Sequence, residues 1–203
     1  MPPAGPVVVT AAVEGLVEEV VVRRLLAHVG ALLGPVHGKN GKGDLRRGLQ
    51  GYNAAAHRVP WLVLVDLNRE TECAPPFKAV WLPDPAPGMC FRVVVREIEA
   101  WFHADRERLS HFLAVSPDQI PADPERLEDP KGAMVELAKH SRRRDVRENM
   151  PPRPGSKREV GPAYTAQLIE FVERHWRPDI AARRADSLRR CLARLREIAR
   201  GGR

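Results

Sequence analysis

Three acidic residues of this sequence, Glu14, Asp66 and Glu97, lie near or directly after the ends of apolar, β-branched runs. The runs are residues 7–13, 61–67 and 91–96. Such runs are typical of buried strands, and the carboxyl ends of parallel strands meet at one edge of a sheet, where ligands bind. Mg²⁺ prefers carboxylate oxygens and leaves room for water and phosphate, so the pattern predicts a divalent-metal site. For each acid alone, the alternative is a first-turn helix residue favoured by the helix dipole.

The elements that must position these acids alternate between strand and helix. Val17, Val21 and Leu25 recur at a four-residue spacing, which predicts a helix over residues 16–29. The other elements expected in this half are a short strand at 35–37, a helix at 44–57 capped by Asp44, a loop at 69–88 and a helix from 97 to 105. Alternating strands and helices predict an α/β fold with a mostly parallel sheet flanked by helices.

The second half of the chain has a different character. It is rich in proline over residues 116–130, and residues 142–161 form a basic, proline-rich segment with Lys157 and Arg158 at its centre. Helices are expected at 132–140, at 164–176 and from Ser187 onward. We therefore expect an α/β core over residues 1–115 that carries the acidic site. A loop-rich, then helical and basic extension over residues 116–203 would pack on it as one unit.

The positive charge is concentrated near the end of the chain. The net charge is +7, and residues 139–203 hold 18 Lys and Arg against 8 Asp and Glu. This asymmetry favours contact with a polyanion, DNA or RNA, although solvated arginines on a helix surface are the alternative.

Composition also excludes several classes. The three cysteines are odd in number and scattered, which predicts a reducing cytoplasm and excludes a disulfide framework or a paired-cysteine zinc site. No apolar run approaches the roughly 20 residues of a membrane span, and no basic segment opens the chain as in a secretory signal. We expect a cytoplasmic protein that does not contact membranes.

Two short motifs extend the argument from the acids to a family. Residues 13–18 (VEGLVE) resemble the acid–glycine turn that opens a Toprim domain, and residues 64–68 (LVDLN) resemble its later Asp-x-Asp strand end. Over most of its length the chain more closely resembles the DUF4276 family, a bacterial Toprim-like group of about this size. The segments that carry this resemblance are residues 95–102 (VREIEAWF), 129–131 (DPK), 160–164 (VGPAY) and 187–188 (SL).

The resemblance implies a Toprim-like Rossmannoid fold that binds Mg²⁺ or Mn²⁺ and acts on phosphodiesters, as in topoisomerases, primases and OLD-type nucleases. It implies that Glu14 is a general acid/base or a metal ligand, that Asp66 binds metal, and that Glu18 lies at the metals. Relatives are often encoded beside an ABC- or SMC-like ATPase and serve in defence against phage. An ATPase subunit is therefore an expected partner, and a homodimer is a further expectation.

Asn68 departs from the Toprim pattern, which has an acid at this position. An amide oxygen can bind Mg²⁺ but brings no negative charge, so the site would hold one metal rather than two, or would be degenerate. Four acids could compensate: Glu70, Glu72, Glu97 and Glu99. Glu97 is best placed because it directly follows a strand. For Glu99 the alternative is a structural role beside Trp101.

Our leading hypothesis is metal-dependent cleavage of nucleic-acid phosphodiesters, with Glu14, Glu18, Asp66 and Asn68 holding the metal and activating water. We take Glu14 and Lys131 as the catalytic residues. The substrate backbone would be contacted by Lys131 or by the pair Lys157 and Arg158. For Lys131, a solvated lysine after Pro130 is the alternative.

Two other functions remain open. One is a catalytically degenerate regulatory subunit that docks on an ATPase, for which Asn68 is the motivating feature. The other is a small-molecule or nucleotide-binding α/β domain. Against the latter, the sequence has no GxGxxG, and the glycine- and lysine-rich residues 38–43 lack the spacing of a P-loop. No GxSxG nucleophile elbow is present either.

Overall fold

The computed structural model describes residues 5–201 and divides the chain into two compact units. The first unit comprises residues 1–94 with 187–203, and the second comprises residues 95–186. The expected division lay at residue 115. In the structure, residues 95–115 group with the second unit instead, and the last helix returns to the first.

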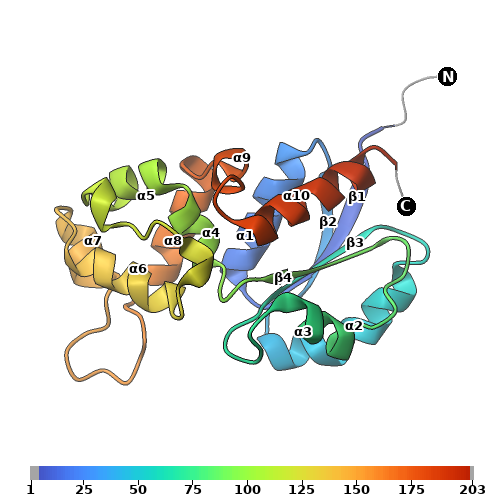
Figure 1. Cartoon of the computed structure of the whole chain (residues 1–203), viewed down its shortest axis with the longest axis horizontal. Helices are drawn as coiled ribbons and strands as arrows, with labels where there is room; N and C mark the ends of the chain where they lie inside the picture. The colour runs from blue at the N-terminus through green and yellow to red at the C-terminus, as the bar shows by residue number, and fades with distance from the viewer. Residues whose placement is uncertain (1–4, 202–203) are drawn as a thin grey trace. The chain divides into compact units, whose positions relative to one another are not determined.

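The first unit is built on a four-stranded, all-parallel sheet, as the alternating pattern predicts (Figure 1). Its strands are β1 (Val8–Val13), β2 (Leu32–Gly38), β3 (Trp61–Asp66) and β4 (Met89–Val94), in the order β2-β1-β3-β4. The two central strands carry most of the apolar runs, and β3 is buried along its length up to Asp66. Hydrophobic burial on both faces therefore explains why β1 and β3 read as continuous apolar sequence.

Helices cover both faces of this sheet. Helices α1 (Leu16–His28) and α10 (Asp186–Ala199) lie on one face, and α2 (Lys42–Ala55) and α3 (Ala74–Trp81) lie on the other (Figure 1). The face under α2 and α3 has a continuous core in which Leu45, Leu49 and Phe77 pack with alternate residues of β3 and β4. Because strand side chains alternate between faces, the neighbouring residues of β4 turn toward the other face.

Two elements differ from the sequence-based expectation. The structure places helix α3 inside residues 69–88, where a loop was expected. Its prolines, Pro75 and Pro76, occupy the first helical turn, where a missing backbone N–H costs no helical hydrogen bond. Helix α2 begins at Lys42 after Gly41, so Asp44 lies in the first turn rather than at the N-cap.

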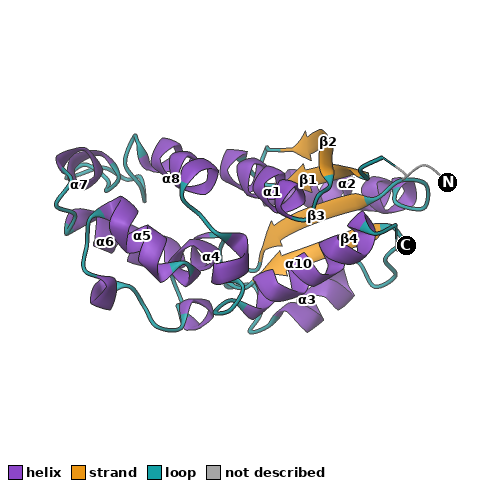
Figure 2. Ribbon diagram, turned by 90° about the horizontal axis from the view of Figure 1, so that it is seen from above, coloured by secondary structure: helices purple, strands orange, loops and turns teal. Residues whose placement is uncertain are grey.

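The second unit consists of helices and loops, and Figure 2 draws every strand of the described chain in the first unit. Its elements are α4 (Glu99–Ala104), α5 (Arg106–Leu113), the short 3₁₀ turns Pro117–Gln119 and Pro124–Arg126, α6 (Pro130–Lys139), α7 (Arg144–Asn149), α8 (Tyr164–Arg174) and α9 (Pro178–Ala181). The core of this unit contains the fully buried Trp101, Phe102, Phe171 and Trp176. The indole of Trp176 donates to the carbonyl oxygen of Trp101 at 3.2 Å.

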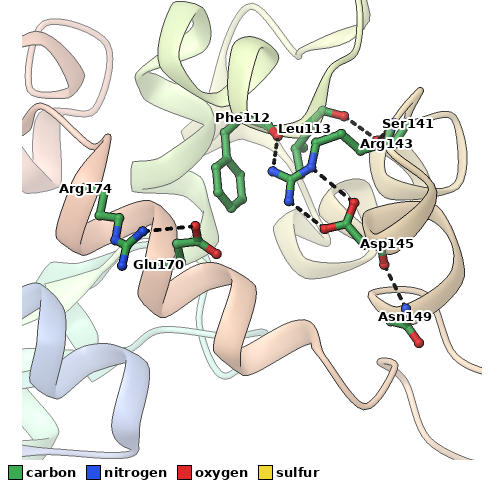
Figure 3. A network of polar contacts seen from close by, with 8 residues as sticks. All are labelled: Phe112, Leu113, Ser141, Arg143, Asp145, Asn149, Glu170 and Arg174. Carbon is green, nitrogen blue, oxygen red and sulfur yellow. Dashed lines mark hydrogen bonds and ion pairs between the residues drawn. The ribbon is translucent and has the colours of Figure 1, made fainter.

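Several arginines of the basic segment hold this unit together. Arg143 donates to the carbonyl oxygen of Phe112 at 3.0 Å and binds the Asp145 carboxylate through two nitrogens, while Ser141 donates to Leu113 O (Figure 3). Arg147 likewise donates to the carbonyl oxygen of Ser141. These arginines therefore have internal acceptors, which accounts for part of the positive charge without a nucleic-acid partner.

Candidate metal centre at the ends of two strands

Glu14 and Asp66 lie at the carboxyl ends of adjacent strands, β1 and β3. The two strands pair in parallel, with Ala12 opposite Val63. The backbone N–H of Asp66 donates to Glu14 Oε1 at 2.8 Å. The sequence-based expectation placed both acids at one sheet edge, and the structure brings them together there.

Glu18 turns back toward the same edge. It lies in the first turn of α1, and its Oε2 is 3.0 Å from the position that a Cβ on Gly15 would occupy. Its negative charge acts on Glu14. The acid–glycine turn therefore gives two neighbouring carboxylates, and a larger residue than glycine at position 15 would crowd the second.

Lys42 adds a positive charge that the sequence analysis did not assign to this site. Its ammonium donates to the carbonyl oxygen of Asp66 at 2.5 Å and forms an ion pair with Glu70 at 2.7 Å. It also lies 5.0 Å from the centre of the Phe77 ring. Lys42 therefore neutralises part of the acidic charge and ties the end of β3 to the start of α2. Glu70, one of the acids considered for compensation, thus has Lys42 as its partner.

The loop before α2 explains how Lys42 reaches this place. Lys39 N donates to Val13 O at 2.8 Å, and Gly41 N donates to Glu14 O at 2.9 Å, so the loop docks on the end of β1. Gly38 has φ +80°, and a Cβ there would lie 2.4 Å from Val13 O. Only glycine fits this approach, and the glycine-lysine segment was a signal that could have pointed to Lys42.

The electrostatics favour a protonatable Glu14. Burial raises the pKa of Glu14 above its usual value, while the hydrogen bond from Asp66 N and the charge of Lys42 lower it. The neighbouring charges of Glu18 and Glu70 raise it again. A carboxyl group with a raised pKa is able to take up and return a proton closer to neutral pH than a solvated one.

Asn68 adopts a backbone conformation that accounts for its residue type. Its φ is +53°, in the left-handed region, where Asn and Asp are enriched. It lies in the turn after β3, which is closed by Glu70 N donating to Leu67 O. The position therefore has a local structural requirement besides any role toward a metal.

The donor chemistry at this edge fits Mg²⁺ or Mn²⁺ as an open site rather than a complete cage. Within residues 5–201, no three His, Cys, Asp or Glu side chains are grouped as a metal site. Mg²⁺ is usually held by one or two carboxylates, with water and substrate phosphate completing its coordination. Glu14 and Asp66 supply two carboxylates, and Asp66 Oδ1 is buried. These residues would hold the ion.

Glu97 and Glu99 belong to the second unit, where both have partners. Glu97 Oε2 accepts from Lys131 N at 3.0 Å, and its Oε1 lies 3.5 Å from Lys131 Nζ. Glu99 is buried, and Tyr164 donates to its Oε1 at 2.9 Å. Burial raises the pKa of Glu99 to about 7. Glu97 thus stabilises the start of α6, whereas Glu99 lies in the interior, where burial favours its neutral form.

Three of the segments that carry the DUF4276 resemblance meet in this unit. Glu97 contacts Lys131, Glu99 contacts Tyr164, and His103 Nε2 lies 3.0 Å from Pro130 O. Residues far apart in sequence therefore form one polar cluster around the start of α6. Within this cluster Lys131 has Glu97 as its partner, in contrast to a freely solvated lysine.

Lys157 and Arg158 lie in an exposed loop whose two ends are held together. Gly161 N donates to Met150 O at 2.7 Å, and Ala163 N donates to Asn149 O at 3.0 Å. A Cβ on Gly161 would lie 2.3 Å from the carbonyl oxygens of Asn149 and Pro151, so glycine permits this closure. The loop thus presents two cations from a fixed base.

Comparison of the chain with protein-family models, with curated proteins and with solved structures finds no match. Within residues 5–201, none of the helices combines the length and apolar character that a membrane span requires.

Proposed function

We propose that this chain is a Toprim-like, Mg²⁺- or Mn²⁺-dependent nuclease of the DUF4276 type. The observation that carries the proposal is that Glu14 and Asp66 meet at two adjacent strand ends, where Asp66 N donates to Glu14 Oε1 at 2.8 Å. The Lys42 ammonium lies beside them and donates to Asp66 O. Two carboxylates and one ammonium suit the metal-assisted cleavage of a phosphodiester. The acids hold a divalent ion, and the cation offsets negative charge on the phosphate.

Each residue has a separate task in this proposal. Glu14 and Asp66 hold the ion, with Glu18 and the Asn68 amide beside it, and the bound ion would polarise the phosphate and lower the pKa of water. The raised pKa of Glu14 belongs to the chain without the ion, and a bound divalent ion would lower it, so that Glu14 holds the ion as a carboxylate. Lys42 keeps the end of β3 in place and reduces the repulsion between the acids and the phosphate.

The nucleic-acid affinity comes from a second set of residues. Lys157 and Arg158 are exposed on the loop whose base Gly161 closes, and each would contact backbone phosphate. Because phosphate contacts release counterions, removing these two charges should reduce the dependence of log K on log salt by about 0.9 per lost contact with duplex DNA. Substituting the exposed Lys139 and Arg174 with alanine removes the same charge and should leave the slope unchanged.

The direct test is cleavage of supercoiled plasmid, single-stranded DNA and tRNA in Mg²⁺, Mn²⁺ or EDTA. We expect metal-dependent cleavage by the wild type that is lost in Glu14→Ala and Asp66→Ala. Glu148→Ala, which removes an exposed carboxylate paired with Arg144, is the matched control and should cleave normally. Cleavage that persists in both site variants would refute the assignment.

Asn68, which stands where the Toprim pattern has an acid, favours one alternative. In that alternative the chain is a regulatory subunit of an ABC- or SMC-like ATPase whose own site does not cut. Calorimetry with Mg²⁺ and Mn²⁺ separates the two. Binding lost in Asp66→Ala supports the nuclease, whereas folded wild-type protein that binds neither ion supports the regulatory subunit. Cytoplasmic location and assembly as a homodimer remain parts of the proposal.

A further inference from the structure

Cys90 and Cys191 form a contact pair inside the first unit. Cys90 lies on β4 and Cys191 on α10, about a hundred residues apart in the chain. Both side chains are buried, both thiols are reduced, and the two are hydrogen bonded to each other. Adjacent thiols on two different elements are the arrangement from which an internal disulfide forms.

A cavity gives access to one member of this pair. It has a volume of about 300 Å³ and is lined by Cys90 together with Lys78, Phe91, Arg92 and the proline-rich loop before β4. This volume is far larger than the space needed by one water-sized molecule. A small oxidant can therefore enter a cavity whose wall includes Cys90, although that residue is only 1% exposed.

The cavity is positively charged. Lys78 and Arg92 line it, and Arg190 and Arg194 act on the same groups from α10. Within the described chain, Lys78 has no ion-pair partner, and burial lowers its pKa, so its ammonium is poorly solvated. Cations close to a thiol stabilise the thiolate, which is the nucleophilic form.

The two thiols are accordingly unequal. The hydrogen bond from Cys191 lowers the pKa of Cys90, against the opposing effect of burial, and the charge of Arg92 contributes. The same hydrogen bond and burial raise the pKa of Cys191. One sulfur is thus an acceptor and nucleophile, and the other keeps its proton.

We propose that Cys90 and Cys191 are a peroxide-oxidised dithiol, with Cys90 as the attacking thiolate and Cys191 as the resolving thiol. The Cys90 sulfur attacks hydrogen peroxide, an S–O bond forms, the O–O bond breaks, and the leaving oxygen departs as water. The Cys191 sulfur then attacks the Cys90 sulfenic acid, an S–S bond forms, the S–O bond breaks, and a second water leaves. Two thiols are oxidised, one peroxide is reduced, and the chain loses two hydrogens.

The position of the pair in the chain gives the bond a consequence. All of residues 95–186 come between the two cysteines, so the disulfide joins β4 to α10 at the two points where the chain leaves and re-enters the first unit. Closing such a long loop constrains the unfolded chain strongly. Oxidation should therefore raise the unfolding temperature of the first unit, a property that does not depend on the proposed nuclease activity.

The first experiment uses the wild-type chain. It is treated with hydrogen peroxide at pH 7, unfolded, alkylated and digested. Before alkylation we expect an intact mass lower by two hydrogens, and after digestion a disulfide-linked pair of peptides that contain Cys90 and Cys191. The exposed Cys73 serves as an internal reference. If Cys73 is oxidised while Cys90 and Cys191 are still fully alkylated, the proposal is wrong.

The second experiment separates the two roles. In Cys191→Ala, dimedone should label Cys90 as a trapped sulfenic acid; in Cys90→Ala, it should leave Cys191 unlabelled. Lys78→Met should slow oxidation several-fold at pH 7 and much less at pH 9, where the thiolate forms without help. Lys139→Met, at an exposed lysine of α6, is the charge-matched control. Labelling of Cys191 but not Cys90, or equal slowing by Lys78→Met at both pH values, would overturn the assignment.

Discussion

Protonation of His103 should destabilise the second unit as the pH falls below neutrality. The ring is fully buried on α4, and its Nε2 lies 3.0 Å from Pro130 O, so the neutral ring donates from Nε2. Within residues 5–201, Nδ1 has no hydrogen-bond partner. A second proton would therefore place a positive charge and an unpaired N–H donor in the interior.

The size of the effect follows from the pKa. Burial lowers the pKa of His103 from 6.5 to about 4, and the charge of Arg184 acts in the same direction, while the bond to Pro130 opposes it. The unfolded chain takes up its proton near 6.5 and the folded chain near 4. The stabilisation is thus complete above pH 6.5 and is lost as the pH falls from 6.5 toward 4. Since a tenfold change in proton affinity is worth about 1.4 kcal/mol, the full loss is about 3 kcal/mol.

His103→Gln isolates this contribution because glutamine keeps an N–H donor for Pro130 O but cannot titrate. Urea unfolding at pH 7.5 and pH 4.5 gives four free energies of unfolding. We expect the wild type to lose between about 2 and 3 kcal/mol more than the variant over this interval. Tryptophan fluorescence follows the unfolding of both units, because Trp61 and Trp81 lie in the first unit and Trp101 and Trp176 in the second. His111→Gln, at an exposed histidine of α5, should follow the wild type. If wild type and His103→Gln lose equal stability, the titration of His103 does not control it.

Three further predictions concern the candidate sites. Burial raises the pKa of Glu99 from 4.5 to about 7, so the stability that its neutral form contributes is present below pH 4.5 and is lost as the pH rises through 7. Between pH 5 and pH 8 the free energy of unfolding of Glu99→Gln, measured in urea, should therefore rise by about 2 to 3 kcal/mol relative to that of the wild type. Glu14→Gln should abolish metal-dependent cleavage and raise the unfolding temperature at pH 8, because burial disfavours the Glu14 charge; an unchanged or lower temperature in calorimetry would contradict this. Gly161→Ala should cost on the order of 1–3 kcal/mol and weaken nucleic-acid binding without a change in charge, whereas Gly155→Ala, with open space around it, should cost about 1 kcal/mol; equal binding by both variants in fluorescence anisotropy would refute a role for the loop base.

The strands and most helices could be predicted because their signals are local. Buried parallel strands require continuous apolar residues, and the runs that end at Val13, Asp66 and Val94 meet this requirement. Helix α3 was not predicted because prolines usually mark loops, although Pro75 and Pro76 are acceptable in the first turn of a helix. The return of α10 to the first unit is a non-local packing event that no local pattern encodes.

The candidate site likewise contains parts that the sequence predicts and parts that depend on tertiary structure. The proximity of Glu14 and Asp66 follows from parallel strands and their shared edge. Lys42 reaches Asp66 O across 24 residues of sequence, because a glycine loop docks on β1 and aims the ammonium at β3. The contact between Cys90 and Cys191 likewise depends on where α10 packs. Both contacts are products of tertiary structure. The glycine-lysine segment was a signal for the loop that carries Lys42, whereas no residue spacing indicated the contact between the cysteines.

Asn68 shows how a motif comparison and a backbone requirement compete for the same residue. Compared with an Asp-x-Asp motif, Asn68 is a lost acid. In the structure, its φ of +53° is one that Asn, Asp and Gly adopt with the least strain, so the choice at this position is narrow whether or not a metal binds. Aspartate would satisfy the same turn, but it would place one more negative charge at an edge that already holds Glu14, Glu18 and Asp66, with Lys42 as a neighbouring cation. Asparagine keeps an oxygen donor and avoids that repulsion, which is consistent with one divalent ion held by few carboxylates.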